Sequence, residues 1–288
     1  MSFSSDVKEE LAKHISTARH CQIAELAAIL NFCGQFGCDA EGNFTIGFQT
    51  ENEAVVRKGF TLLQKTYNIK NDAIITEEQM QELMAKIGNI DEPVDSLLIK
   101  NSCCKRAFLR GAFLAIGSIS DPNKGYHLEF VCTDEKKAEA LQNVMQSFDL
   151  DAKIVQRKKY YVVYIKEGSG IVDLLNVCEA HVALMDLENL RILKEMRNSI
   201  NRRVNCEAAN ITKTVNAASR QIEDILYIRD FYGFQNLPDN LREMAEVRLE
   251  NPDAPLKELG ELLSTPVGKS GVNHRLRKLS ELADRLRT

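Results

Sequence analysis

The sequence predicts an α+β fold in which a duplicated N-terminal domain precedes an all-α C-terminal domain. Residues 1–90 and 100–182 show the same order of helical and strand-like patterns, which indicates an internal repeat. Beyond residue 183 the apolar residues recur only at helical spacing. We therefore expect a duplicated domain over 1–182, a connecting helix over 183–205 and a helical domain over 206–288. Two domains also suit 288 residues, since a domain commonly holds roughly 150.

The first copy alternates helical and strand patterns. Its first helix carries apolar residues at three- and four-residue spacing. Thr50 and Glu53 have the spacing of a capping box, which predicts a helix start there. The expected elements are a helix at 23–34, a turn at 41–43, a strand at 44–48, a helix to 67, a strand region at 69–75 and a helix to 87.

The second copy restarts the pattern 83 residues later. Six of thirty aligned positions are identical, and Gly34 with Gly117 is one such pair. The strand alternation slips by one residue between the copies, so the turns should differ. The expected elements are a helix at 105–119, a turn at 121–123, a strand at 126–130, a helix at 133–148, a hairpin of 154–155 and 160–165 around the basic turn 157–159, and a helix at 171–178.

The C-terminal region is predicted to end in a helix-turn-helix. Separate helices are expected at 217–231 and 238–250, and Asn251-Pro252-Asp253 breaks the pattern. A short helix at 256–263, a turn at 264–268 and a longer helix to 285, capped by Ser270, follow. A short helix, a tight turn and a longer helix are typical of this DNA-binding motif.

The last helix supplies the candidate DNA contacts. Its apolar residues form one stripe, which leaves the polar side chains on the other faces. Asn can bind adenine and Arg guanine in the major groove, while backbone N–H groups at a helix start can bind phosphate. An amphipathic helix with a solvated basic face is the alternative. The candidate residues are Lys269, Ser270, Gly271, Asn273, His274, Arg275, Arg277 and Lys278.

Charge is distributed unevenly along the chain. Residues 1–196 carry 22 Lys and Arg against 28 Asp and Glu, whereas residues 197–288 carry 15 against 13. The last twenty residues hold six basic and two acidic side chains, so a phosphate backbone is best met at the C-terminal end. No apolar run approaches the roughly 18–20 residues of a membrane helix, and no signal peptide is apparent, so we expect a cytoplasmic protein.

No catalytic, cofactor or metal site is expected from the sequence. The eight cysteines show no CxxC spacing, and the adjacent pair Cys103-Cys104 suits a single zinc ion poorly. Structural thiols buried in apolar surroundings are the favoured interpretation over zinc ligands. The histidines are scattered, and no phosphate-binding or hydrolase motif is present.

The two repeated helices, Leu26–Gly34 and Leu109–Gly117, resemble the LAGLIDADG helix of homing endonucleases. Their small residues would let two such helices pack backbone to backbone. In active members of that family, the last acidic residue of each motif holds Mg²⁺. Those positions are Cys33 and Ile116 here, and neither offers the hard oxygen ligand that Mg²⁺ requires. The resemblance thus implies the fold, while the missing ligands argue against DNA cleavage.

Nearly the whole chain resembles the WhiA family of bacterial proteins. The resemblance is carried by three stretches, Cys103–Pro122, Asn201–Gln221 and Gly268–Leu279. It implies a degenerate LAGLIDADG domain joined to a helix-turn-helix domain, and roles in transcription regulation, cell division, chromosome segregation and sporulation. It also implies a nucleoid-associated protein with a sigma factor as a candidate protein partner.

The Asn201–Gln221 stretch is polar and basic. Its candidate phosphate contacts are Arg202, Arg203, Lys213 and Arg220, and a solvated linker helix is the alternative. Three functions remain open at this point. The chain is a transcription regulator that binds double-stranded DNA, a nuclease, or a protein-interaction adaptor for a sigma factor or the division machinery.

Overall fold

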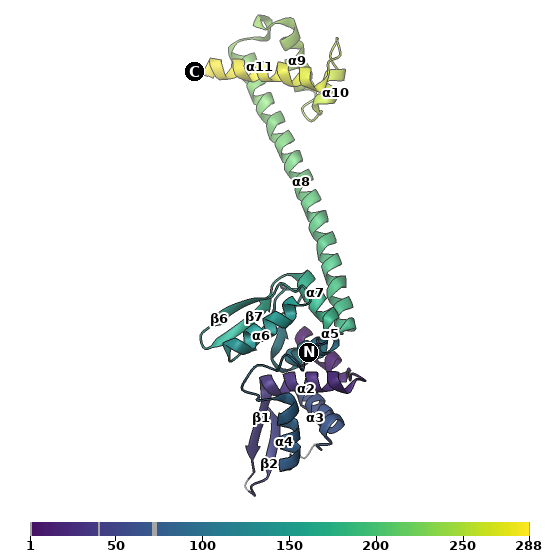
Figure 1. Ribbon diagram of the computed structural model, residues 1–288. Helices are drawn as coiled ribbons and strands as arrows, with labels where there is room; N and C mark the ends of the chain where they lie inside the picture. The colour runs from purple at the N-terminus through teal and green to yellow at the C-terminus, as the bar shows by residue number, and fades with distance from the viewer. Residues whose placement is uncertain (1, 40, 71–73, 288) are drawn as a thin grey trace. The chain divides into compact units, whose positions relative to one another are not determined.

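The computed structural model describes residues 2–39, 41–70 and 74–287 and confirms the α+β fold. The chain divides into two compact units, residues 1–195 and 196–288. Figure 1 shows the course of the chain, with sheets only in the first unit. None of the described helices is both long and apolar enough to cross a membrane.

The first unit contains the repeat that the sequence predicts. In the first copy the elements are α2 (Arg19–Cys33), β1 (Gly34–Cys38), β2 (Phe44–Phe48), α3 (Glu53–Tyr67), β3 (Ile74–Ile75) and α4 (Glu77–Ile87), preceded by α1 (Phe3–Lys13). In the second copy they are α5 (Ser102–Ile116), β4 (Gly117–Ile119), β5 (Leu128–Cys132), α6 (Glu135–Gln146), β6 (Lys153–Arg157), β7 (Tyr160–Ile165) and α7 (Gly168–Val177). Helices α2 and α5 both have 15 residues and begin 83 positions apart.

The two sheets are antiparallel, with strand orders β1-β2-β3 and β4-β5-β7-β6. Gly34 pairs with Phe48, fourteen residues on, whereas Gly117 pairs with Phe130, thirteen residues on. The second hairpin is therefore one residue shorter. This difference explains why the alternation of apolar residues slips by one between the copies.

Several predicted boundaries were wrong. The helix expected at 105–119 ends at Ile116, because its last residues form β4. Helix α3 is capped by Asn52, whose side chain accepts from the Ala54 N–H, instead of by Thr50. The strand expected at 126–130 begins at Leu128. Part of the strand region expected at 69–75 lies outside the described residues.

Helices α2 and α5 pack against each other at the centre of the first unit (Figure 1). A Cβ added to Gly111 of α5 would lie 2.4 Å from the Glu25 backbone oxygen of α2 and 2.9 Å from the Ala28 Cβ. Only glycine lets the two backbones approach this closely. The close packing that the small residues predict is thus present at this position.

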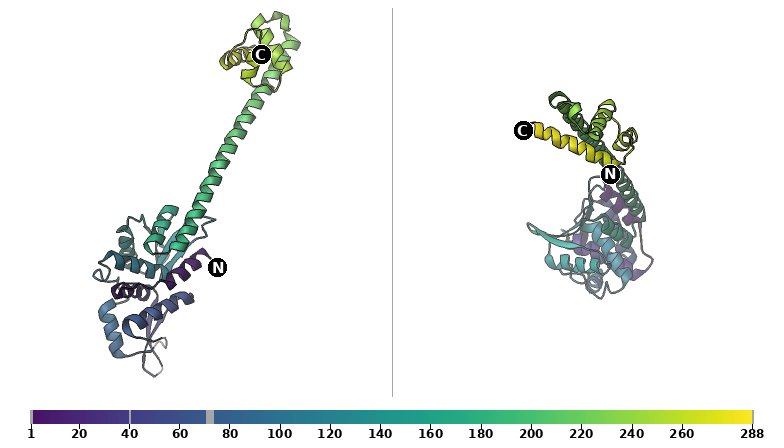
Figure 2. Two further views of the ribbon diagram at one scale, coloured as in Figure 1. Left: turned by 90° about the vertical axis from the view of Figure 1, so that its right-hand side faces the viewer. Right: turned by 90° about the horizontal axis from the view of Figure 1, so that it is seen from above.

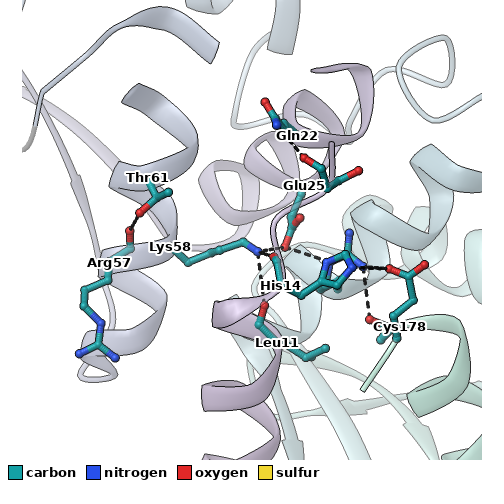
Figure 3. Close-up of polar contacts among 11 residues, drawn as sticks. Leu11, His14, Gln22, Glu25, Arg57, Lys58, Thr61 and Cys178 are labelled. Atoms are coloured by element: carbon teal, nitrogen blue, oxygen red, sulfur yellow. Dashed lines mark hydrogen bonds and ion pairs between the residues drawn. The ribbon is translucent and has the colours of Figure 1, made fainter. Parts of the chain in front are cut away.

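A network of charged side chains is buried between α2, α3 and α5 (Figure 3). Glu25 is fully buried, and its Oε1 lies 3.0 Å from Lys58 Nζ and 3.1 Å from Arg110 Nε. Arg110 also pairs with Glu179 at 2.6 Å, and Glu179 pairs with His14 at 3.0 Å. Burial lowers the pKa of Lys58. The network therefore joins helices from both copies of the repeat.

The second unit is all helical. Helix α8 (His181–Phe231) is continuous, so the break expected between a connecting helix and a helix at 217–231 is absent from it. A 3₁₀ turn (Phe234–Asn236), α9 (Asp239–Glu250), α10 (Leu256–Glu261) and α11 (Lys269–Arg287) follow. Figure 2 shows these helices gathered around the C-terminal end of α8. Ile225 and Ile228 of α8 share one apolar core with residues of α9, α10 and α11.

Candidate nucleic-acid interface

Helices α10 and α11 form the helix-turn-helix, and Gly260 sets the tightness of the turn. The Val267 N–H donates to the Gly260 carbonyl at 3.1 Å. A Cβ on Gly260 would lie only 2.1 Å from the Val267 backbone oxygen. No larger residue fits without moving the segment that leads into α11. The turn therefore fixes the start of α11 against α10.

Buried apolar side chains fix the rotation of α11 about its axis. Val272, Leu276, Leu279 and Ala283 are all buried in the core of the second unit. Their spacing of three and four residues places them along one face of the helix. The opposite face is consequently directed to solvent over the first three turns.

Six of the eight candidate DNA-contacting residues lie on the solvent side of α11. Arg277 is the more exposed of the two candidates that form ion pairs: its side chain is 76% exposed and pairs with Glu281, 2.9 Å away on the same helix. The exposed set is Lys269, Ser270, Asn273, His274, Arg277 and Lys278. Together they form the α11 polar face, which combines positive charge with groups able to hydrogen-bond base edges.

Arg275 takes a different place from the other candidates. Its side chain is only 17% exposed and lies 3.9 Å from Glu243 of α9. Glu243 also accepts a hydrogen bond from the Ser264 N–H in the turn. The bond from Ser264 and the charge of Arg275 lower the pKa of Glu243. Glu243 thus links α9 to the turn by a hydrogen bond and to α11 by a longer ion pair with Arg275, a contact that the sequence does not reveal.

The start of α11 lies two residues before the expected one. Helix α11 begins at Lys269, so Ser270 lies inside the first turn and does not cap the helix. The Gly271 N–H already donates to the Gly268 carbonyl at 2.9 Å. Phosphate binding by this helix start would consequently use the N–H groups of Lys269 and Ser270, which have no intrahelical acceptor by helix geometry.

The candidate phosphate contacts on α8 are all exposed. Arg202, Arg203 and Lys213 lie on a stretch whose side chains are directed to solvent throughout. Arg220 lies 3.8 Å from Asp284 of α11, which ties it loosely to the helix-turn-helix. Exposure leaves all four able to meet a phosphate, and it equally fits a solvated helix.

Cys33 and Ile116 stand where active LAGLIDADG endonucleases carry their metal-holding acidic residues. They are the last residues of α2 and α5. Cys33 is buried and Ile116 is half-buried. Burial raises the pKa of the Cys33 thiol to about 12, so this side chain is neutral at ordinary pH. Neither position supplies the carboxylate that would hold Mg²⁺.

Family models match most of the chain. They are the WhiA N-terminal LAGLIDADG-like domain over residues 19–82, the WhiA LAGLIDADG-like domain over 105–197 and the WhiA C-terminal HTH domain over 200–283. The chain belongs to the WhiA family. Its relatives include proteins named "Probable cell division protein WhiA" from Lachnoclostridium phytofermentans, 53% identical, and from Alkaliphilus metalliredigens, 48% identical. The alignments cover this whole chain and 100% and 99% of the respective WhiA relatives.

A solved structure supports the same assignment. Full-length DUF199/WhiA from Thermatoga maritima is 26% identical to this chain, with a TM-score of 0.60 and 99% of both chains covered. The WhiA resemblance noted from the sequence is therefore confirmed across its full length.

Proposed function

We propose that this WhiA-family chain is a DNA-binding regulator of cell division that binds double-stranded DNA through the α11 polar face and does not cleave it. The observation that carries the proposal is the arrangement of α11. Its apolar stripe is buried, its turn is fixed by Gly260, and its exposed side carries Asn273, Arg277 and Lys278. A helix held in this way can enter a major groove with its first turns against the bases.

Sequence preference would come from Asn273 and Arg277, and affinity from the basic residues around them. Arg277 would exchange Glu281 for a base edge on binding. Arg275 would act through Glu243 by fixing α11, so it is proposed as a positioning residue. Chromosome segregation, sporulation-type development and association with the nucleoid are further parts of this proposal, and they rest on the family resemblance.

The absence of cleavage is supported by Cys33 and Ile116, which replace the acidic residue at each former metal position. A phosphodiester mechanism with two metal ions needs ligands that hold and orient both ions. In this proposal the duplicated fold therefore serves a purpose other than DNA cleavage.

The proposal is tested by binding to duplex DNA. Genome-wide mapping of bound DNA supplies the duplex, and fluorescence anisotropy measures its affinity for the full chain. Arg277→Ala should weaken binding by about 5- to 150-fold, since a lost bidentate base contact costs about 1–3 kcal/mol. Arg229→Ala is the matched control because Arg229 is also exposed and also ion-paired, to Asp230 at 2.9 Å on α8. Equal affinity in both variants would overturn the assignment of Arg277.

Salt dependence separates phosphate contacts from base contacts. Each phosphate contact contributes about −0.9 to the slope of log affinity against log salt concentration. Lys278→Ala should therefore flatten the slope by about 0.9 and weaken binding to all duplexes alike. An unchanged slope would remove Lys278 from the interface.

An adaptor role is the second candidate function. The observation that favours it is the acidic excess of residues 1–196, which argues against strong DNA binding by this part of the chain. A sigma factor as the partner rests on the family resemblance. Capture of a purified sigma factor by the full chain in the absence of DNA, with no affinity of the chain for the mapped duplexes, would favour this candidate over the first.

A further inference from the structure

Four potential metal ligands meet at the N-terminal ends of α2 and α5. His20 and Cys21 are the second and third residues of α2, and Cys103 and Cys104 are the second and third residues of α5, 83 positions later. One ligand atom from each residue lies within 4.8 Å of all the others. His20 Nδ1 is 3.2 Å from Cys104 Sγ and 3.4 Å from Cys21 Sγ. The repeat therefore supplies two ligands from each copy.

The cluster is half enclosed. Cys21 and Cys104 are buried, with 4% and 2% of their surface exposed, while His20 and Cys103 are exposed. Burial and the neighbouring thiols raise the pKa of Cys104 to about 12, and burial raises the pKa of Cys21. A cation that binds Cys21 and Cys104 must therefore displace their protons.

We propose that His20, Cys21, Cys103 and Cys104 form a zinc site with one imidazole and three thiolate ligands. Zn–S bonds of about 2.3 Å and Zn–N bonds of about 2.0 Å give tetrahedral ligand separations of about 3.6–3.8 Å. The longest separations, of up to 4.8 Å, need to shorten by about 1 Å, and the distances of 3.2 and 3.4 Å from His20 Nδ1 need to widen by about 0.2–0.4 Å. Binding replaces three S–H protons by three Zn–S bonds and releases three protons, which leaves a net charge of −1 on the site.

The chemistry of the donors selects the ion. Three thiolates and an imidazole suit Zn²⁺, whereas Mg²⁺ and Ca²⁺ prefer oxygen ligands. The N-terminal ends of α2 and α5 carry partial positive charge, which stabilises the net negative charge of the occupied site. Four protein ligands complete the tetrahedral coordination of zinc, so the ion would be structural. It would fasten the two copies of the repeat at the helix ends opposite Cys33 and Ile116.

The experiment uses the full chain, purified under reducing conditions without oxygen. Co²⁺ serves as the spectroscopic probe, and Zn²⁺ is titrated in competition with a chromophoric chelator. We expect one ion per chain and the thiolate-to-cobalt charge-transfer and intense visible bands of a tetrahedral site. His20→Ala and Cys103→Ser should lose these bands, and both replace exposed side chains, so the fold should survive. Circular dichroism of each variant checks that it does.

Cys38→Ser and Cys206→Ser are the matched controls because Cys38 and Cys206 are exposed and lie outside the cluster. They should bind Co²⁺ and Zn²⁺ as the parent chain does. Retention of the cobalt bands in His20→Ala and Cys103→Ser would overturn the site. So would the absence of thiolate–cobalt absorption in a parent chain whose eight thiols are all free by titration.

Discussion

Replacing Glu25 with glutamine should destabilise the first unit strongly. Glu25 is fully buried and is the carboxylate that both Lys58 and Arg110 meet, at 3.0 and 3.1 Å. Glutamine has nearly the same shape and no charge, so two buried cations would face each other without this counter-ion. Breaking a buried ion pair in this way costs about 3–5 kcal/mol. For a unit of this size the melting temperature should fall by roughly 6–20 °C.

Arg57→Ala is the matched control for this prediction. Arg57 and Glu9 lie 3.2 Å apart, but their side chains are 63% and 36% exposed, so their pair should contribute less than about 1 kcal/mol. Urea unfolding of the full chain, followed by hydrogen exchange in the first unit, measures both losses. Similar losses for Glu25→Gln and Arg57→Ala would refute the reasoning, because burial would then not decide the contribution of an ion pair.

Three further predictions concern packing, pH and the turn. Gly111→Ala should lower the free energy of unfolding in urea by about 1–3 kcal/mol, because the added Cβ meets the α2 backbone. Gly125 has open space around it, so Gly125→Ala should lower it by less than about 0.5 kcal/mol. Burial lowers the pKa of His14 below 6.5, so the unfolded chain binds the proton more readily. The free energy of unfolding should therefore fall as the pH drops below about 6.5, and it should fall less steeply in His14→Gln. An equal pH dependence of unfolding in the parent chain and in His14→Gln would contradict this. Gly260→Ala should weaken DNA binding in anisotropy titrations by displacing the start of α11, while Gly268→Ala should not; equal affinities would exclude the turn from the interface.

The fold could largely be predicted because the sequence contains two copies of one pattern of helices and strands. The offset of 83 residues places α2 and α5 correctly, since both helices are apolar enough to be buried on all sides. Strands β1 and β4 escaped prediction because Gly34–Cys38 contains two glycines and Gly117–Ile119 is only three residues long. Neither shows the alternation of apolar residues from which a strand is recognised.

The polar face of α11 was predictable because helix geometry alone separates buried from exposed positions. Arg275 escaped because its position next to the apolar stripe does not reveal the contact with Glu243 from another helix. The histidine and cysteine cluster escaped because the sequence shows no CxxC spacing and because the adjacency of Cys103 and Cys104 argued against a zinc ion. Its two halves are 83 residues apart in sequence, and only the packing of α2 against α5 brings them together. The expectation that the cysteines are buried is correct for five of the eight and wrong for Cys38, Cys103 and Cys206, which are exposed.

Photo-crosslinking tests most directly whether the α11 polar face meets DNA. A photoreactive amino acid is placed at His274, on that face, or at Phe231, an exposed side chain of α8 with 72% of its surface accessible. Each full-length variant is bound to the mapped duplex and irradiated. We expect crosslinks to bases from position 274 and none from position 231. Bound DNA that crosslinks from position 231 and not from position 274 would contradict this expectation.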